Sequence, residues 1–184
     1  MIAGRGGRNR SRQRRRGVRV KFCPLCASPL IWRVLSGRER PSCPSCHFVY
    51  YEDPKLVAVA LIPIDGKLVL GRRAINPRSG YWTFPSGYVN RGEAVDAATV
   101  REVQEETHLE VQVETLLGLY SEAGNPVVLA AYVTRAVGGC LSAGDETSEV
   151  GLFQPNELPE LAFPNDTRIL RDWLDYEHRN SNRR

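Results

Sequence analysis

The 184-residue sequence lacks any uninterrupted apolar run of about 18 residues, the length that a membrane-spanning helix needs. Nothing at its start resembles a secretory signal peptide. Both absences favour a cytoplasmic protein without a membrane anchor. Histidine is also scarce. The three histidines stand in a cysteine motif, at a helix end and in the C-terminal tail, so a Ser/His/Asp arrangement for nucleophilic catalysis is not expected.

Acidic residues are absent from residues 1–21, which hold eight arginines and one lysine. The formal net charge of +4 at pH 7 therefore misleads, because the rest of the chain has 16 Lys and Arg against 21 Asp and Glu, a formal charge of −5. With almost no bulky apolar residue, residues 1–19 are predicted to be a disordered basic head that binds polyanions weakly. A transit peptide or a start codon assigned too early are the alternatives; we favour a dispensable head.

Four of the five cysteines form two C-x2-C pairs separated by 16 residues. The pairs are Cys23 with Cys26 and Cys43 with Cys46. This spacing is typical of a zinc site with four thiolates, whereas two disulfides would need an oxidising compartment. A closed site leaves no position for water, so the zinc is expected to be structural and to stabilise a ribbon at residues 20–52. Ala27 and His47 stand where zinc ribbons often carry glycine.

Alternating apolar runs and turn residues predict strands that are covered by helices. The expected strands are 56–62, 67–70, 81–84, 111–121, 127–134 and 148–153. Asp65-Gly66 predicts a hairpin turn, and Gly138-Gly139 predicts a turn after the fifth strand. A C-terminal helix is predicted over residues 166–178. Its inward-facing residues are expected to be Ile169, Leu170, Trp173 and Leu174.

Three glutamates gather on a second predicted helix, over residues 94–108. At about 100° per residue, Glu102, Glu105 and Glu106 share one face, and like charges at this spacing repel unless something neutralises them. Magnesium or manganese ions holding a phosphorylated substrate would do so. An ordinary helix with a solvated acidic face is the alternative. The buried stripe opposite is expected to consist of Ala97, Val100, Val103 and Thr107.

The wider spacing around these glutamates resembles the Nudix box, G-x5-E-x7-R-E-U-x-E-E-x-G-U, where U is a bulky aliphatic residue. The matching residues are Gly87, Glu93, Arg101, Glu102, Val103, Glu105, Glu106 and Leu109. His108 replaces the final glycine and would have to end the helix in the left-handed conformation, in which histidine is enriched among non-glycine residues. The resemblance implies an α/β/α sandwich with a mixed sheet over residues 55–178.

The resemblance also implies metal-dependent hydrolysis of the pyrophosphate bond of a nucleoside diphosphate linked to another moiety. The implied ligands of Mg²⁺ or Mn²⁺ are Glu102, Glu105 and Glu106. Glu102 or a later glutamate would act as general base. Arg101 is expected to orient a carboxylate, either Glu102 or Glu93. For a further carboxylate after the box, Glu149 is preferred over Asp145 and Glu146.

Several residues outside the helix are candidates for substrate binding. They are Arg72, Arg73 and Arg78 for phosphate or ribose, Tyr81 for stacking on a base, and Gly87 for close approach of the backbone. A four-cysteine ribbon before a Nudix domain is similar to proteins that act on ADP-ribose, FAD or NADH. NADH pyrophosphatases carry an S-Q-P-W-P-F-P-x-S motif that residues 119–125 lack, so ADP-ribose or FAD, with release of AMP, is the preferred prediction.

Two other functions remain open. One is hydrolysis of NADH or NAD-capped RNA, and the other is a non-catalytic module that senses nucleotides or binds nucleic acid. The complete set of glutamates favours the enzyme, since a sensor has no need to keep all three. Many relatives are dimers, so a homodimer is a further expectation.

Overall fold

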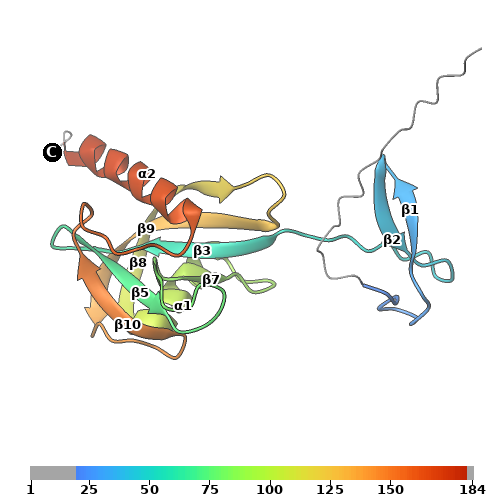
Figure 1. Cartoon of the computed structure of the whole chain (residues 1–184), viewed down its shortest axis with the longest axis horizontal. Coiled ribbons are helices and arrows are strands. Elements are labelled where there is room, and N and C mark those ends of the chain that lie inside the picture. The colour runs from blue at the N-terminus through green and yellow to red at the C-terminus, as the bar shows by residue number, and fades with distance from the viewer. Residues whose placement is uncertain (1–19, 182–184) are drawn as a thin grey trace, which may run out of the picture. The chain divides into compact units, whose positions relative to one another are not determined.

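The structure, a computed structural model, describes residues 20–181 (Figure 1). Contacts divide the chain into two units, Met1–Glu52 and Asp53–Arg184. The predicted basic head at residues 1–19 lies outside the described residues. None of the helices in the described part is long and apolar enough to cross a membrane.

The first unit contains one antiparallel hairpin, formed by β1 (Ile31–Leu35) and β2 (Arg38–Ser42). Ser36 and Gly37 connect the strands, and both have positive φ angles, 49° and 75°. Two left-handed residues in succession are the geometry of a type I′ turn, whose twist matches that of the strands. One cysteine pair precedes β1 and the other follows β2.

The central sheet of the second unit has the strand order β7-β3-β9-β8. Its strands are β3 (Lys55–Leu61), β7 (Ser86–Tyr88), β8 (Leu109–Ser121) and β9 (Val127–Gly139). The pair β3–β9 is parallel and the other pairs are antiparallel, so the sheet is mixed. The prediction of a turn at Gly138-Gly139 is wrong, because both glycines still pair with β8 and the chain turns only after them.

A second sheet consists of β4 (Pro63–Ile64), β5 (Lys67–Arg73), β6 (Trp82–Thr83) and β10 (Thr147–Phe153). The predicted hairpin turn at Asp65-Gly66 is confirmed, with Ile64 paired to Lys67. The strand before the turn is β4, and β3 pairs in the central sheet instead. The chain thus passes from one sheet to the other between Leu61 and Pro63.

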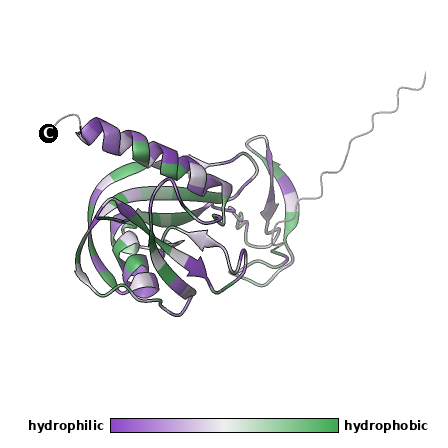
Figure 2. Cartoon of the chain, turned by 60° about the vertical axis from the view of Figure 1, so that its left-hand side comes forward, coloured by the Kyte–Doolittle hydropathy of each residue, from purple (hydrophilic) through white to green (hydrophobic). Residues whose placement is uncertain are grey.

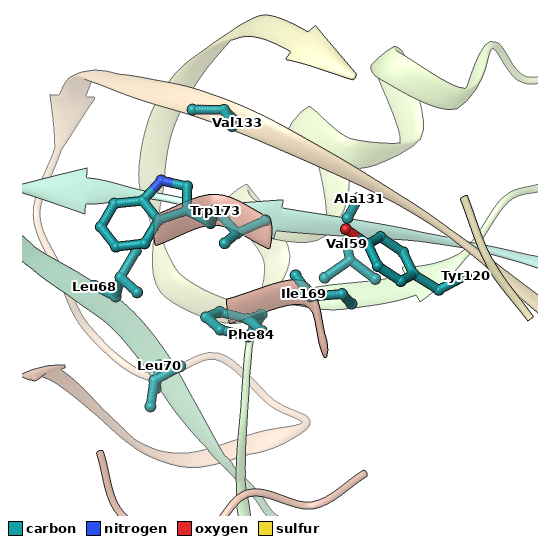
Figure 3. Close-up of a cluster of buried hydrophobic side chains, with 10 residues drawn as sticks. Val59, Leu68, Leu70, Phe84, Tyr120, Ala131, Val133, Ile169 and Trp173 are labelled. Carbon is teal, nitrogen blue, oxygen red and sulfur yellow. The ribbon is translucent and has the colours of Figure 1, made fainter. Parts of the chain in front are cut away.

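Two helices, α1 (Val95–Thr107) and α2 (Pro164–Ser181), pack on opposite faces of the central sheet. Successive side chains of a strand point to opposite faces, and β3 shows the consequence. Val59 packs in the cluster that contains Ile169 and Trp173 of α2 (Figure 3). Leu61 belongs to the same cluster. Ala60 packs in the second cluster, beside Val103 of α1. The predicted α/β/α sandwich with a mixed sheet is confirmed.

The C-terminal helix α2 alternates hydrophobic and hydrophilic residues along its length (Figure 2). The predicted inward residues are confirmed: Ile169 and Trp173 are buried, and Leu170 and Leu174 are partly buried against the same cluster. The prediction begins the helix at Asp166, whereas the observed helix begins at Pro164, so Asp166 lies in its first turn.

The buried face of α1 differs in part from the prediction. Val103 and Thr107 are buried as expected, but Ala97 and Val100 are exposed and Ala98 and Thr99 are buried instead. On the helical wheel Ala98 is about 40° from Glu102, so the helix is rotated toward its acidic side. All three glutamates were expected to face away from the fold, whereas the Glu102 carboxylate packs against Gly87 of β7.

Candidate active site

A cavity of about 960 Å³ lies in the second unit, between α1, the loop before it and the start of α2. The polar residues that line it include all three glutamates of α1, and among the others are Arg73, Arg101, Glu122, Asn125, Glu146 and Asp166. Gly87 also lines the cavity. The volume is near the upper end of the range of about 300–1,000 Å³ that small-molecule sites occupy.

Gly87 provides the space in which the carboxylate of Glu102 lies. A Cβ atom added at position 87 would overlap all three atoms of that carboxylate. The close approach holds the Glu102 side chain between α1 and β7. The glycine that opens the sequence motif is therefore required by packing against the glutamate, in addition to any approach of substrate.

Glu106 lies deepest among the three glutamates. The backbone N–H of Ser86 donates a hydrogen bond to its Oε2 atom at 3.1 Å. Burial raises the pKa of Glu106 to about 7, and the nearby charges of Glu102 and Glu146 act in the same direction. Burial also raises the pKa of Glu102. In both groups the removal of the carboxylate from water is the largest cause of the shift.

Arg101 joins the glutamates of the helix to the loop before it. Its guanidinium binds both oxygens of Glu93, with Nε–Oε1 and Nη2–Oε2 distances of 2.7 and 3.0 Å. Nη1 donates to Glu102 at 2.7 Å and to Glu105 at 2.9 Å, and Nη2 donates to the Tyr88 carbonyl at 3.1 Å. The hydrogen bonds that Arg101 donates to Glu93 depress the pKa of Glu93 to about 2. Both partners that the sequence offered for Arg101 are in contact with it.

The loop that follows β9 packs against the C-terminal end of α1. His108 ends the helix with φ of 56°, the left-handed conformation that its position requires. The N–H of Gly144 donates to the carbonyl of Glu106 at 3.0 Å, and a Cβ atom at 144 would overlap the carbonyl of Glu105. This contact places Glu146 in the cavity wall.

Glu146 is the functional candidate that sequence reasoning set aside. It lines the cavity and its charge acts on Glu102 and Glu106, whereas Glu149 does not line the cavity. Glu149 pairs with Arg72 instead, at 3.4 Å between exposed groups. The sequence feature that could have indicated Glu146 is Gly144, because a glycine before an acidic pair is consistent with a close backbone contact.

The two candidate arginines of β5 point in different directions, because they are adjacent in a strand. Arg73 lines the cavity; its Nε donates to the Pro77 carbonyl at 2.8 Å, and its guanidinium lies over the Phe163 ring. Arg72 does not line the cavity. Neither does Tyr81, which lies under the guanidinium of Arg78. Substrate roles for Arg72 and Tyr81 stay predictions without support from the cavity.

Asp166 forms the opposite wall of the cavity, at the start of α2. It is 3% exposed and accepts hydrogen bonds from the Phe163 N–H at 3.1 Å and the Thr83 hydroxyl at 3.3 Å. Burial raises the pKa of this carboxyl to about 7. The sequence predicted Asp166 only as the first residue of the C-terminal helix and gave it no role in the site.

The glutamates fit a divalent ion by their chemistry. Carboxylate oxygens are the ligands that Mg²⁺ and Mn²⁺ prefer, and a bound cation would stabilise the charged forms of Glu102 and Glu106, which burial disfavours. The three carboxylates do not converge as closely as the cysteines do, since Arg101 holds Glu102 and Glu105 by ion pairs. Within residues 20–181, three or more ligand atoms come within 4.8 Å of one another only at the four cysteines.

The four cysteines of the first unit fit zinc. Their Sγ atoms lie within 4.8 Å of one another, and three pairs are 3.5 Å apart. Sulfurs bound at about 2.3 Å in a tetrahedron around one Zn²⁺ would be about 3.8 Å apart. All four are free thiols, so the disulfide alternative is not formed. Ala27 and His47 have φ angles of 58° and 61°, the conformation that glycine would adopt more easily.

Comparisons with known proteins agree with both units. The family described as NUDIX domain matches residues 54–174, and the family described as Nudix N-terminal, a zinc ribbon, matches residues 21–52. An ADP-ribose pyrophosphatase of Methanocaldococcus jannaschii is 36% identical over 132 residues, which are 70% of this chain and 78% of that protein. The NAD-capped RNA hydrolase NudC of Vibrio atlanticus is 24% identical, and this chain covers 52% of its length.

The fold is also found among solved structures. The crystal structure of a NUDIX hydrolase from Nitrosomonas europaea superimposes with a TM-score of 0.81 at 29% identity, over 86% of this chain and 93% of that one.

Proposed function

The chain belongs to the Nudix hydrolase family, and we propose that it hydrolyses the pyrophosphate bond of ADP-ribose and releases AMP and ribose 5-phosphate. The observation that carries the proposal is that Glu102, Glu105 and Glu106 line one cavity together with Glu146.

The residues of the chain divide the work. Ser86 fixes the Glu106 carboxylate through its N–H, Gly87 makes room for Glu102, and Arg101 orients Glu102 and Glu105. When bound by these glutamates, Mg²⁺ or Mn²⁺ would neutralise the pyrophosphate oxygens and lower the pKa of a bound water. We assign Glu146, in place of Glu149, as the further carboxylate of the site.

Two observations support ADP-ribose as the substrate. The relative named ADP-ribose pyrophosphatase is 36% identical over 70% of this chain, whereas relatives named NAD-capped RNA hydrolase are 24% to 32% identical. The segment that lacks the NADH pyrophosphatase motif ends β8 and turns toward β9, and its Glu122 and Asn125 line the cavity. Arg73 and Arg72 are adjacent in β5, so their side chains point to opposite faces of the strand. Only Arg73 lines the cavity, where its guanidinium can bind a substrate phosphate.

A cytoplasmic location belongs to the same proposal, because a four-thiolate zinc site needs reduced cysteines. A homodimer remains a proposal drawn from the family alone.

The test is release of AMP from ADP-ribose, FAD and NADH in the presence of Mg²⁺. We expect ADP-ribose to be hydrolysed with the highest kcat/KM and Glu106→Gln to lower kcat by about 100-fold or more. Glu110→Gln, an exposed glutamate outside the cavity, is the matched control and should change little. Preference for NADH would instead favour the alternative pyrophosphatase, and no release from any dinucleotide would favour the sensor.

A further inference from the structure

Three arginines lie on one face of the β1–β2 hairpin in the first unit. The register pairs Arg33 with Arg40 and Leu35 with Arg38. Side chains of directly paired residues share a face, and residues two apart along a strand do so as well. Arg33, Arg38 and Arg40 therefore project from the same side, which we call the arginine face. Glu39 pairs with Val34 and projects from the other side.

The arginine face has no acidic partner. In the described part of the chain, the side chains of Arg33, Arg38 and Arg40 form no ion pair and no hydrogen bond, and only the backbone carbonyl of Arg40 accepts a side-chain hydrogen bond, from the Ser42 hydroxyl. Like charges placed directly opposite across two strands destabilise a sheet, and Arg33 and Arg40 are placed in that way. Such an arrangement is consistent with an anionic ligand that offsets the repulsion.

An exposed aromatic ring completes this face. The guanidinium of Arg40 lies 4.5 Å from the centre of the Tyr51 ring, and Tyr51 remains 59% exposed. A planar guanidinium on an aromatic ring offers both a donor for phosphate and a flat surface on which a base can stack. An acidic peptide would use the charge and leave the stacking surface without a role.

The charge of the surrounding sequence points the same way. Residues 20–52 contain four Lys and Arg against two Glu, and residues 1–19, which precede them, contain eight arginines and no acid. The type I′ turn at Ser36 and Gly37 holds the hairpin that carries the arginines. We propose that the zinc ribbon binds single-stranded nucleic acid through Arg33, Arg38, Arg40 and Tyr51, with phosphates on the arginines and a base stacked beside Tyr51.

This binding is separate from the proposed hydrolysis, so the two can fail independently. The test uses the full zinc-loaded chain and a fluorescent single-stranded oligouridylate of roughly 12 nucleotides, within the site sizes seen for single-strand binders. One variant combines Arg33→Gln, Arg38→Gln and Arg40→Gln. The matched control combines Arg135→Gln, Arg171→Gln and Arg179→Gln, which removes the same charge from the second unit and retains the basic head.

We expect the ribbon variant to raise the Kd by at least tenfold and the control variant by less than twofold. The slope of log K against log salt should fall by about 2 in the ribbon variant, since each lost phosphate contact removes about 0.7 for a single strand. Equal weakening in both variants would overturn the proposal, because net charge alone would then explain the binding. Zinc content must stay at one per chain, so that loss of the fold is recognised.

Tyr51 separates nucleic acid from other polyanions. Tyr51→Ala should weaken binding of the oligouridylate by about fivefold or more, as loss of one stacked base does, while Tyr51→Phe retains it. A heparin fragment, which has no bases, should be insensitive to Tyr51→Ala. If the oligouridylate is equally insensitive, or if a duplex binds as tightly as the single strand, the surface is a general polyanion site and the proposal is wrong.

Discussion

The α-carbon of Gly87 and the carboxylate of Glu102 occupy adjoining space, with no room between them for a side chain at position 87. The contact joins β7 to α1, so the strand that precedes the helix determines where its first site glutamate lies. Glu102 is consequently partly buried, and its pKa is raised by that burial. The Glu102 carboxylate therefore has less contact with water than a surface carboxylate and lies in a defined position.

Gly87→Ala is expected to displace the Glu102 carboxylate and to lower kcat/KM for ADP-ribose by about 100-fold, the usual cost of misplacing a catalytic group by about 1 Å. Steady-state kinetics at saturating Mg²⁺ would measure the loss. Gly66→Ala is the control, since a Cβ at position 66 meets nothing within 4 Å although the backbone there has a positive φ. Equal loss in both variants would show that general glycine replacement, and not the contact with Glu102, is responsible.

Arg101→Lys is expected to lower activity by about 10- to 100-fold and to raise the Mg²⁺ concentration needed for half-maximal rate. The reason is geometric: one ammonium cannot replace a planar guanidinium that contacts Glu93, Glu102 and Glu105 together. Arg135→Lys, which affects a more exposed pair with Glu114, should leave both quantities nearly unchanged. An unaltered Mg²⁺ dependence in Arg101→Lys would contradict the orienting role.

Local rules predicted the parts of this site that depend on helix periodicity and spacing. The helix predicted over 94–108 and observed at Val95–Thr107, its acidic face and the left-handed residue at His108 follow from residue types within one stretch of chain. The cysteine cluster follows from two tight turns with the right separation. In each case, the positions that determine the feature are close together in the sequence or repeat with a fixed period.

The remaining features depend on contacts between distant segments. The rotation of α1 that buries Ala98 instead of Ala97 depends on Gly87, a residue outside the helix. The choice between Glu146 and Glu149 depends on Gly144, which packs on the last turn of α1. No periodicity in the sequence records which loop reaches which helix end, so these points required the tertiary structure.

Glu146→Gln is expected to lower kcat by at least tenfold, because its carboxylate faces the cavity and acts on Glu102 and Glu106. Glu149→Gln should have an effect of less than about threefold, since Glu149 forms only an exposed pair with Arg72, of the kind that contributes little. Paired kinetic measurements on the two variants decide between the positions. A larger loss for Glu149→Gln would restore the interpretation made from sequence.

Asp166 predicts a measurable pH dependence of stability. Its pKa is about 7 in the folded chain against 3.8 for the ordinary side chain, because burial disfavours the charged form. The folded state therefore retains a proton that the unfolded state has lost. The free energy of unfolding falls as the pH rises through this window, and the contribution is lost above the folded pKa.

Asp166→Asn removes this titration while an amide oxygen can still accept from Phe163. The unfolding free energy of the variant, relative to the unmodified chain, should rise by up to about 4 kcal/mol between about pH 4 and pH 8, at about 1.4 kcal/mol for each pKa unit. Urea unfolding without divalent metal, at both pH values, gives this difference. Glu106, whose pKa is also raised, is present in both proteins and cancels. A difference that stays constant with pH would mean that Asp166 ionises in the folded chain as readily as in the unfolded one.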